Sequence, residues 1–208
     1  MAIKVKVCGM KYPDNIAAAA SLGIDYMGFI FYDQSKRYVG ESSSVFIKQL
    51  EHPSKVGVFV NASLSEILVK IAEFQLNMIQ LHGNESVEFC VELKEKSGIT
   101  VIKAFGIDQD FDWAQLNPYA EVIDYFLFDT KSSSHGGTGI QFDWSLLDQY
   151  KLTTPYFLSG GLDPENIKTA LERNDPRLYA LDLNSKFEVE PGLKDIDLLT
   201  QSINNIKK

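Results

Sequence analysis

The chain has 208 residues, of which 45% are hydrophobic and 23% charged, and its formal net charge is −8. This length suits one large domain or two small ones, and the composition is typical of a water-soluble globular protein. The negative balance argues against nucleic acid as a partner, since its phosphates would be repelled. It does not exclude an anionic small molecule, because main-chain amides and helix N-termini bind anions whatever the overall charge.

The start of the sequence and its cysteines indicate a compartment. The first eight residues contain no apolar stretch of the signal-peptide kind, and no apolar run reaches the length of a membrane span. The two cysteines, Cys8 and Cys90, make neither a disulfide framework nor a metal site. We therefore expect a cytoplasmic protein with free thiols and no membrane contact, in which Cys90 packs among the apolar residues of a helix.

Short apolar strands alternate with helical segments along the whole chain. The predicted strands cover 3–7, 26–31, 55–60, 78–81, 100–104, 122–128, 156–158 and 178–181. The predicted helices cover 13–22, 44–50, 64–74, 85–96, 111–116, a segment after Asp143, a segment from Pro164, and 193–206. Ser63, Asp143 and Asp163 are the residue types that cap helix N-termini, and each stands just before a predicted helix.

Eight strand–helix units in succession predict the fold class. Alternating strands and helices make a parallel sheet joined by right-handed crossovers. Eight units that close on themselves form a (β/α)8 TIM barrel, which we expect to span residues 1–208 as a single α/β domain. A doubly wound open sheet is the alternative, but it commonly has fewer strands and a Gly-rich turn after the first one. This chain has Cys8-Gly9-Met10-Lys11 there.

The first strand places a thiol at the mouth of such a barrel. Period-two alternation puts Lys6 and Cys8 on one side of this strand and the Ile and Val residues on the other. We assign the side with Lys6 and Cys8 to the barrel axis and the apolar side to the helix layer. An ammonium inside the barrel needs a partner. Because strand eight closes against strand one, we predict a Lys6–Asp182 ion pair beneath Cys8 that favours the thiolate. The alternative leaves Lys6 pointing outward along a helix.

Asp129 ends the sixth strand and precedes a loop with serines at 132–134 and glycines at 136, 137 and 139. A carboxylate at the carboxyl end of a buried strand, beneath a Gly-rich loop, is how a barrel enzyme presents an acid to its substrate. The alternative is that Asp129 only begins an Asx turn and that the glycines only make the loop flexible.

Three polar residues at other strand ends are candidates for substrate contacts. Arg37, in the loop after the second strand, is either a solvated charge or a planar fork for a substrate carboxylate. Gln80 and His82 lie on the same side of the fourth strand at its carboxyl end. A histidine in that position is as suited to bonding a loop carbonyl as to doing chemistry.

The ends of strands seven and eight predict an anion site. Gly160 and Gly161 precede the Asp163-Pro164 helix start, which leaves main-chain N–H groups near a helix N-terminus. Asn184 and Ser185 follow strand eight. The loops after strands seven and eight are where barrels commonly hold phosphate.

Taken together, these residues resemble the phosphoribosylanthranilate isomerase family of tryptophan biosynthesis along essentially the whole chain. The resemblance is carried, in order, by 6–9, 35–37, 56–60, 80–83, Asp129 with 136–139 and 142–144, 159–162, and Asp182 with 191–195. The resemblance implies an Amadori rearrangement of N-(5-phosphoribosyl)anthranilate, a small-molecule substrate, without metal or cofactor, in a monomer or homodimer.

The same resemblance implies roles for individual residues. Cys8 would be the general base and Asp129 the general acid, although their intrinsic pKa order is the reverse of what those roles need. Arg37 would meet the anthranilate carboxylate. The further residues implied to contact substrate are Gln80, His82, Gly137, Gly160, Gly161, Asp182, Asn184 and Ser185.

One position departs from the family pattern. Lys186 stands where the family has glycine after strand eight, and a side chain there would strain a left-handed backbone. We therefore expect either altered phosphate geometry or a direct contact from the ammonium. Two other functions remain open on the same scaffold: a barrel that epimerises or cyclises sugar phosphates, and a barrel that binds without catalysis.

Overall fold

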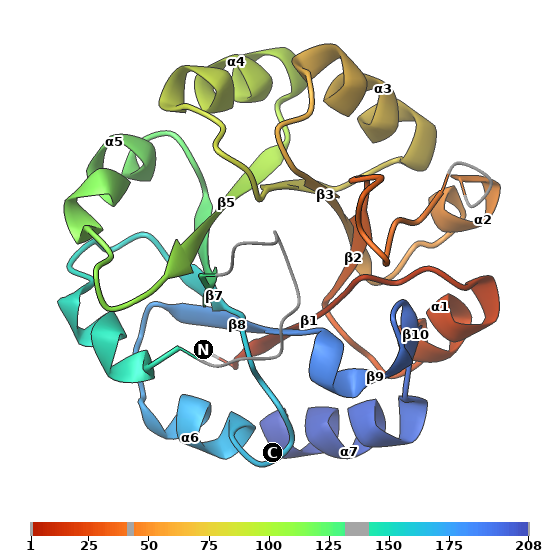
Figure 1. Cartoon of the computed structure of the whole chain (residues 1–208). Coiled ribbons are helices and arrows are strands. Elements are labelled where there is room, and N and C mark those ends of the chain that lie inside the picture. Colours follow the sequence, from red (N-terminus) through yellow and green to blue (C-terminus); the bar gives the residue numbers. More distant parts are fainter. Residues whose placement is uncertain (1, 41–43, 132–141, 208) are drawn as a thin grey trace.

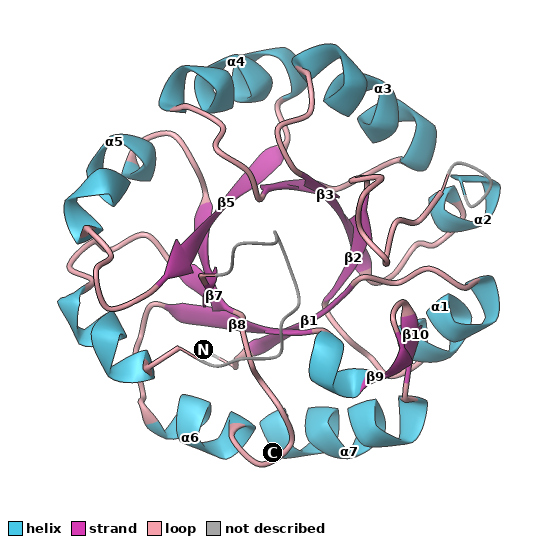
Figure 2. Cartoon of the chain, viewed as in Figure 1, coloured by secondary structure: helices cyan, strands magenta, loops and turns pink. Residues whose placement is uncertain are grey.

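The computed structural model describes residues 2–40, 44–131 and 142–207, and within them eight parallel strands close into a barrel in sequence order. Figures 1 and 2 show the helices as an outer ring around these strands. The strands are β1 (Lys4–Cys8), β2 (Tyr26–Ile30), β3 (Ser54–Phe59), β4 (Met78–Leu81), β5 (Thr100–Ile107), β6 (Tyr125–Thr130), β7 (Tyr156–Leu158) and β8 (Leu178–Leu183). The predicted (β/α)8 fold class is confirmed.

The outer ring contains α-helices and short 3-10 helices. The α-helices are α1 (Pro13–Ala20), α2 (Ser44–Lys48), α3 (Leu64–Phe74), α4 (Val87–Ser97), α5 (Asn117–Ala120), α6 (Ile167–Glu172) and α7 (Ile196–Ile206). The 3-10 helices are η1 (Trp113–Leu116), η2 (Trp144–Gln149) and η3 (Ser185–Phe187). Ser63 caps α3 by accepting the Glu66 N–H, and Asp143 caps η2 by accepting the Ser145 N–H, as predicted.

The sixth strand starts later than predicted. Strand β6 begins at Tyr125, because the N–H groups of Val122 and Ile123 both donate to the Tyr119 carbonyl and close the turn after α5. The β-branched residues at 122 and 123 therefore belong to a turn, although their side-chain types favour a strand.

The prediction of a helix from Pro164 is also wrong in its start. Helix α6 begins at Ile167, since Asp163 Oδ1 accepts the N–H groups of Glu165 and Asn166 at 2.9 Å and holds them in a turn. The sequence analysis expected main-chain N–H groups near this helix start to be available to an anion. Those of Glu165 and Asn166 are instead bonded to the Asp163 carboxylate.

A hairpin precedes the last helix where the sequence predicted helix from residue 193. Strand β9 (Glu188–Glu190) pairs antiparallel with β10 (Leu193–Lys194) through a turn in which Gly192 has φ +92°. Only glycine adopts that backbone readily, and Pro191 before it cannot continue a ladder. Helix α7 then begins after Asp195, whose side chain accepts the Leu198 N–H.

Aromatic side chains fill the amino-terminal half of the barrel. Phe157 on β7 is fully buried at the axis, and its ring lies 5.4 to 5.6 Å from those of Tyr125, Tyr179 and Tyr26. The hydroxyls of Tyr26 and Tyr179 are 2.6 Å apart and hydrogen-bonded. With the floor closed, a cavity on the axis can open only at the carboxyl ends of the strands.

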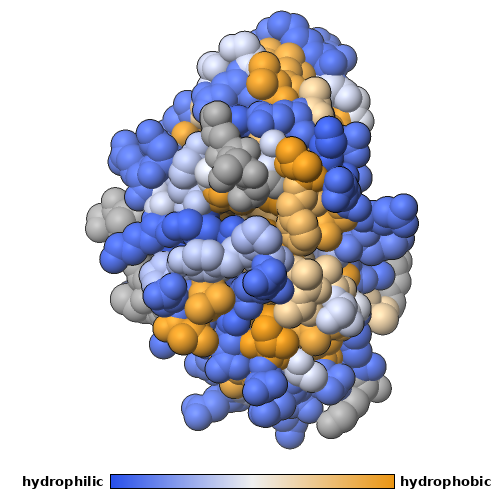
Figure 3. Space-filling view, turned by 90° about the vertical axis from the view of Figure 1, so that its right-hand side faces the viewer, coloured by the Kyte–Doolittle hydropathy of each residue, from blue (hydrophilic) through white to orange (hydrophobic). Residues whose placement is uncertain are grey.

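The outer surface is mainly polar. Figure 3 shows hydrophilic residues over most of one face, with hydrophobic residues in small separate groups. The most exposed large apolar side chain in the described residues is Val189, in the hairpin. None of the helices in the described ranges is long and apolar enough to cross a membrane.

Truncating the ring at the centre of the floor should destabilise the barrel. We expect Phe157→Ala to lower the free energy of unfolding by about 3–5 kcal/mol, because the cavity left at the axis cannot collapse between eight strands. Urea denaturation measures this, with Val69→Ala on the exposed face of α3 as control, expected to change stability by less than about 0.5 kcal/mol. A loss for Phe157→Ala as small as for the control would contradict the closed floor.

Candidate active site

A cavity of about 450 Å³ opens at the carboxyl ends of the strands. Its lining includes seven of the residues predicted from the sequence: Cys8, Arg37, Gln80, His82, Asp129, Asp182 and Asn184. Gly160, Gly161 and Ser185 do not line it, and Gly137 lies outside the described residues. The structure therefore brings the predicted acid, the predicted base and the predicted carboxylate-binding arginine to one space.

Cys8 ends β1 and is almost fully buried, with its thiol against β2. Its register partner on that strand is Gly28, and a Cβ there would come within 2.7 Å of the Cys8 Sγ. Glycine at this position therefore provides the space that the thiol occupies. Cys90, by contrast, is buried in the core beneath α4, as predicted, and both thiols are free.

The predicted ion pair beneath Cys8 is confirmed. Lys6 Nζ donates to both carboxylate oxygens of Asp182 at 2.9 Å, and the two side chains are 0% and 4% exposed. The two residues are register partners between β1 and β8, where the barrel closes. Both carboxylate oxygens of Asp182 are thus hydrogen-bonded to Lys6. Asp182 therefore lines the cavity but has its charge already paired within the protein.

The prediction that Cys8 is poised as a thiolate is not supported. Burial raises the pKa of the Cys8 thiol, and the charge of Asp182 raises it further, while Lys6 and Lys194 lower it. The net pKa lies above its ordinary value. The ammonium of Lys6 therefore acts in the predicted direction, but desolvation outweighs it.

Asp129 at the end of β6 has the properties of a buried acid. Burial raises the pKa of its carboxyl to about 6, against the lowering effect of the Thr130 N–H, which donates to Oδ1 at 2.7 Å. A Cβ on Gly160 would lie 2.7 Å from that same Oδ1, so the β7 loop closes directly over the carboxyl group. Asp129 therefore remains within β6, where Thr130 also belongs to the strand, and presents a protonatable group to the cavity.

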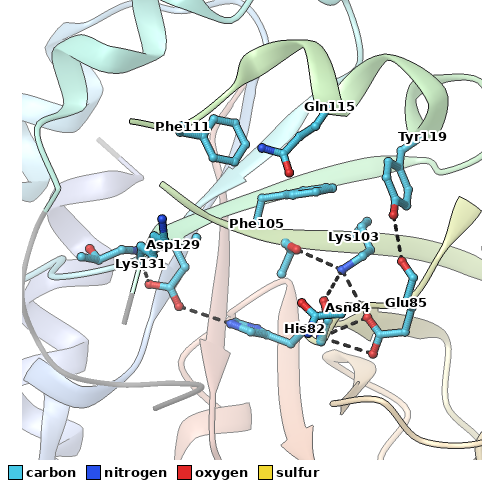
Figure 4. Close-up of a pocket in the computed structure, with 14 residues that line it drawn as sticks. His82, Asn84, Glu85, Lys103, Phe105, Phe111, Gln115, Tyr119, Asp129 and Lys131 are labelled. Carbon is cyan, nitrogen blue, oxygen red and sulfur yellow. Dashed lines mark hydrogen bonds and ion pairs between the residues drawn. The ribbon is translucent and has the colours of Figure 1, made fainter. Parts of the chain in front are cut away.

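Gln80 and His82 form a chain that leads to Asp129. Gln80 Nε2 lies 2.7 Å from His82 Nδ1, and His82 Nε2 lies 3.6 Å from Asp129 Oδ2. Figure 4 shows His82 facing Asp129 across the cavity wall. When the Gln80 amide donates to Nδ1, the imidazole proton sits on Nε2 and faces the carboxylate. The side of the fourth strand predicted to carry both residues is therefore correct.

A second cavity of about 460 Å³ adjoins the first and shares His82 and Asp129 with it. Aromatic rings from 105–119, including Phe105 and Tyr119, form one wall (Figure 4). Lys103 lies beneath, fully buried, and donates to the Gly83 carbonyl at 2.7 Å beside the Glu85 carboxylate at 3.2 Å. Its charge is thus satisfied within the wall.

Arg37 lines the first cavity but is held by a residue that the sequence analysis missed. Its Nε and Nη2 donate to the Glu188 carboxylate at 2.7 to 3.0 Å, and Lys194 Nζ donates to the same carboxylate at 2.7 Å. Glu188 and Lys194 belong to the β9–β10 hairpin. The turn signal Pro191-Gly192 is the pattern that could have revealed the hairpin.

The loops that the sequence analysis predicted to hold phosphate follow β7 and β8. Gly160 and Gly161 both have positive φ, and no acceptor within the described ranges bonds their N–H groups. The Asn184 side chain accepts from Lys194 at 2.8 Å and is therefore used within the protein. Lys186 lies in η3 and is not among the residues with positive φ, so the strain expected there is absent.

These features are those of an enzyme on a (β/α)8 barrel, in which a buried thiol and a buried carboxyl face one cavity. Across 2–40, 44–131 and 142–207, no group of three or more His, Cys, Asp or Glu residues is placed to hold a metal ion. Residues 5–205 match the family described as N-(5'phosphoribosyl)anthranilate (PRA) isomerase, and the chain belongs to that family.

Individual relatives agree over nearly the whole chain. The chain is 48% identical to N-(5'-phosphoribosyl)anthranilate isomerase of Parabacteroides distasonis, covering 97% of this chain and 92% of that protein. It is 45% identical to that of Phocaeicola vulgatus, covering 98% of each. Family membership decides against both other functions left open by the sequence, the sugar-phosphate epimerase or cyclase and the non-catalytic barrel.

Solved structures extend the comparison to the fold. Phosphoribosylanthranilate isomerase of Thermotoga maritima matches with a TM-score of 0.85 and 37% identity, covering 99% of this chain and 98% of that one. A second matching structure, with a TM-score of 0.82, 36% identity and the same coverage, is a complex with reduced 1-(o-carboxyphenylamino)-1-deoxyribulose 5-phosphate.

The raised pKa of Asp129 predicts a stability cost at neutral pH. The unfolded carboxyl titrates near 3.8 and the folded one at about 6, so the folded state holds the proton more tightly. The contribution of Asp129 to the free energy of unfolding is then greatest below the pKa of the unfolded state and is lost as pH rises through about 6. A pKa shift of about two units corresponds to a loss of at most about 3 kcal/mol.

Asp129→Asn should therefore be more stable than the wild type at pH 7.5, by up to about 3 kcal/mol, and about equally stable near pH 4. The neutral amide keeps the oxygen that accepts the Thr130 N–H and carries no charge to desolvate. Urea denaturation of both proteins across this pH range tests it, and a difference that does not grow with pH would contradict the assignment.

Proposed function

We propose that this chain uses Asp129 as general acid and Cys8 as general base to convert N-(5-phosphoribosyl)anthranilate into 1-(2-carboxyphenylamino)-1-deoxyribulose 5-phosphate. The reaction is that of its family in tryptophan biosynthesis. The observation that carries the residue roles is the buried carboxyl whose pKa is raised to about 6, facing the same cavity as the buried thiol. An acid kept partly protonated near neutral pH is what the first step needs.

The first step opens the sugar. Asp129 donates its proton to the furanose ring oxygen, the bond from that oxygen to C1 breaks, and the anilino nitrogen supplies the electrons to form an iminium. Oδ1 already accepts the Thr130 N–H, so the transferable proton resides on Oδ2, the oxygen nearer His82. His82, whose Nε2 lies 3.6 Å from Oδ2, is placed to stabilise the carboxylate that this step leaves.

The second step moves hydrogen from C2. The Cys8 thiolate removes the C2 proton, the electrons pass to the iminium carbon and nitrogen, and an enolamine forms that tautomerises to the ketone. The iminium is itself the electron sink, so the residues present suffice for the chemistry. Base and acid come from β1 and β6, which β7 and β8 separate in the closed barrel.

The proposed mechanism uses Cys8 and Asp129 in the less populated of their two singly protonated forms. At pH 7 to 8 the structure favours thiol at Cys8 and carboxylate at Asp129, since burial raises the pKa of the thiol above its ordinary value and that of the carboxyl only to about 6. The reactive combination of thiolate and carboxylic acid is then a minor form of the free enzyme. Catalysis through a minor form is sufficient when that form is regenerated by fast proton exchange.

Binding groups surround the reacting atoms on two sides. Arg37 is the cation suited to the anthranilate carboxylate, and the N–H groups of Gly160 and Gly161 are suited to the phosphate. Gln80 Oε1 is buried without a hydrogen-bond partner among the described atoms and is suited to a ribose hydroxyl. Asn184 and Ser185 would complete the phosphate site from the β8 side.

The remaining expectations from the sequence stay predictions. They are a single domain over 1–208, a cytoplasmic location, a monomer or homodimer, and no nucleic-acid partner. The substrate is a small molecule, as for the relative in complex with the reduced product analogue.

Removing either catalytic group should abolish most activity. We expect Cys8→Ala and Asp129→Asn each to lower kcat by about 10²–10⁴-fold, the usual contribution of a positioned proton-transfer group. Loss of the fluorescence of phosphoribosylanthranilate measures turnover. Cys90→Ala, which removes the other thiol, should keep kcat near that of the wild type. Near-normal turnover in either catalytic variant would show that its residue has another role.

Titration of the Cys8 thiol tests whether this residue is protonated in the resting enzyme. In the Cys90→Ala background we expect the thiolate absorbance near 240 nm to rise with a midpoint above pH 9, because burial raises the pKa of Cys8. The step should be missing when Cys8 is also replaced by Ala, and it should move to still higher pH in Lys6→Met, which lacks the nearby positive charge. A midpoint below pH 8 would show a thiolate at rest.

A further inference from the structure

Glu188 occupies the centre of a buried charge cluster at the edge of the active-site cavity. It accepts the Arg37 fork from one side and Lys194 from the other, and the Gly192 N–H donates to its Oε1 at 3.1 Å. Glu188 is 4% exposed, Lys194 0% and Arg37 13%. Such a carboxylate is fully engaged and has no capacity left to contact a substrate as an acid or base.

The cluster has a net charge of +1, because it contains two cations and one carboxylate. Two cations, Arg37 and Lys194, share the single carboxylate of Glu188. Lys194 also donates to the side chain of Asn184, which is neutral. An uncompensated charge in a desolvated site is unfavourable, so the cluster is complementary to one more anion.

The backbone around the cluster fixes where that anion can meet Arg37. Gly9 has φ +76°, and a Cβ there would come within 2.7 Å of Arg37 Cδ and 2.9 Å of Asn184 Oδ1. Arg37 is thus packed against bare main chain on one side and bonded to Glu188 through Nε and Nη2. Among the described residues, nothing bonds its third nitrogen, Nη1, and the side chain lines the cavity.

We propose that Glu188 is a positioning residue which, through the β9–β10 hairpin, holds Arg37 as a clamp selective for the ortho-carboxylate of the arylamine substrate, with the buried Lys194 supplying positive charge behind it. This deepens the proposed function and rests on it, because the carboxylate is that of the anthranilate ring. Arg37 contacts the ligand directly, whereas Glu188 acts by fixing the orientation of the guanidinium and keeping Lys194 charged. The pKa of Lys194 is lowered to about 8 by burial, and Glu188 is the main group opposing that shift.

The proposal makes a prediction opposite to that of simple electrostatics. Replacing Glu188 by Gln removes a negative charge near an anionic ligand, which by charge alone should strengthen binding. If Glu188 orients the clamp, Glu188→Gln should instead weaken binding, since Arg37 loses its fixed geometry and Lys194 loses its proton more readily. The sign of the effect therefore separates positioning from bulk charge.

Binding of two product analogues to the intact enzyme tests this by calorimetry. One is reduced 1-(o-carboxyphenylamino)-1-deoxyribulose 5-phosphate, and the other is the same compound with hydrogen in place of the carboxyl group. We expect Glu188→Gln and Arg37→Lys each to raise Kd roughly tenfold or more for the first analogue and to leave Kd for the second within about twofold. Glu188→Asp, which keeps the charge on a shorter stem, should recover part of the loss.

Three outcomes would overturn the proposal. Tighter binding of the carboxylated analogue by Glu188→Gln would show a bulk-charge effect. Equal weakening toward both analogues would show that Glu188 only maintains the hairpin. An unchanged Kd in Glu188→Gln would show that Arg37 does not need Glu188 to bind the carboxylate. The thermal unfolding transition of each variant serves as the control for folding.

Failure of the proposed function gives a different result. In that case the wild-type enzyme would not turn over phosphoribosylanthranilate at all, whatever the variants do. If wild type is active and Arg37→Lys binds both analogues normally, the reaction stands and the carboxylate clamp is wrong.

Discussion

The ion pair between Lys6 and Asp182 is the constraint around which the barrel mouth is built. It joins the first and last strands at the closure, with both oxygens of one carboxylate accepting from one ammonium at 2.9 Å. Breaking a buried pair of this kind by removing one member typically costs about 3–5 kcal/mol, because the other charge is left without water or partner. The pair also separates an aromatic floor, centred on Phe157, from the polar cavity above it.

The same pair explains why burial decides the protonation states of Cys8 and Asp129. Lys6 lowers the pKa of both Cys8 and Asp129, and Asp182 raises both, so their effects largely oppose each other at each site. Desolvation is then the largest remaining influence, and it favours the neutral forms. Moving the proton from Cys8 to Asp129 is therefore unfavourable, because burial raises the pKa of the thiol above its ordinary value while the carboxyl has a pKa of about 6.

Much of this site could be predicted from the sequence because its parts obey local rules. Strand parity placed Lys6 under Cys8, and closure of the barrel supplied Asp182 as its partner. The pKa of Cys8 could not be predicted this way, since it depends on how tightly Gly28 and the neighbouring strands exclude water. Nor could the bond between Arg37 and Glu188, which are 151 positions apart and meet through a hairpin that interrupts an otherwise helical pattern.

The β7 loop and the β9–β10 hairpin present different kinds of group, and this difference bears on the departure at Lys186. Gly160 and Gly161, in the loop after β7, offer main-chain N–H groups, whose directions are set by the backbone and not by the residue that follows β8. Lys186 lies in η3 without positive φ, so the chain accommodates it where glycine was expected. At the hairpin the groups are the side chains of Arg37, Glu188 and Lys194, in which the Glu188 carboxylate pairs with both cations. A substitution after β8 therefore leaves the main-chain N–H groups of the β7 loop in place, whereas a substitution at Arg37, Glu188 or Lys194 removes a charged group of the cluster.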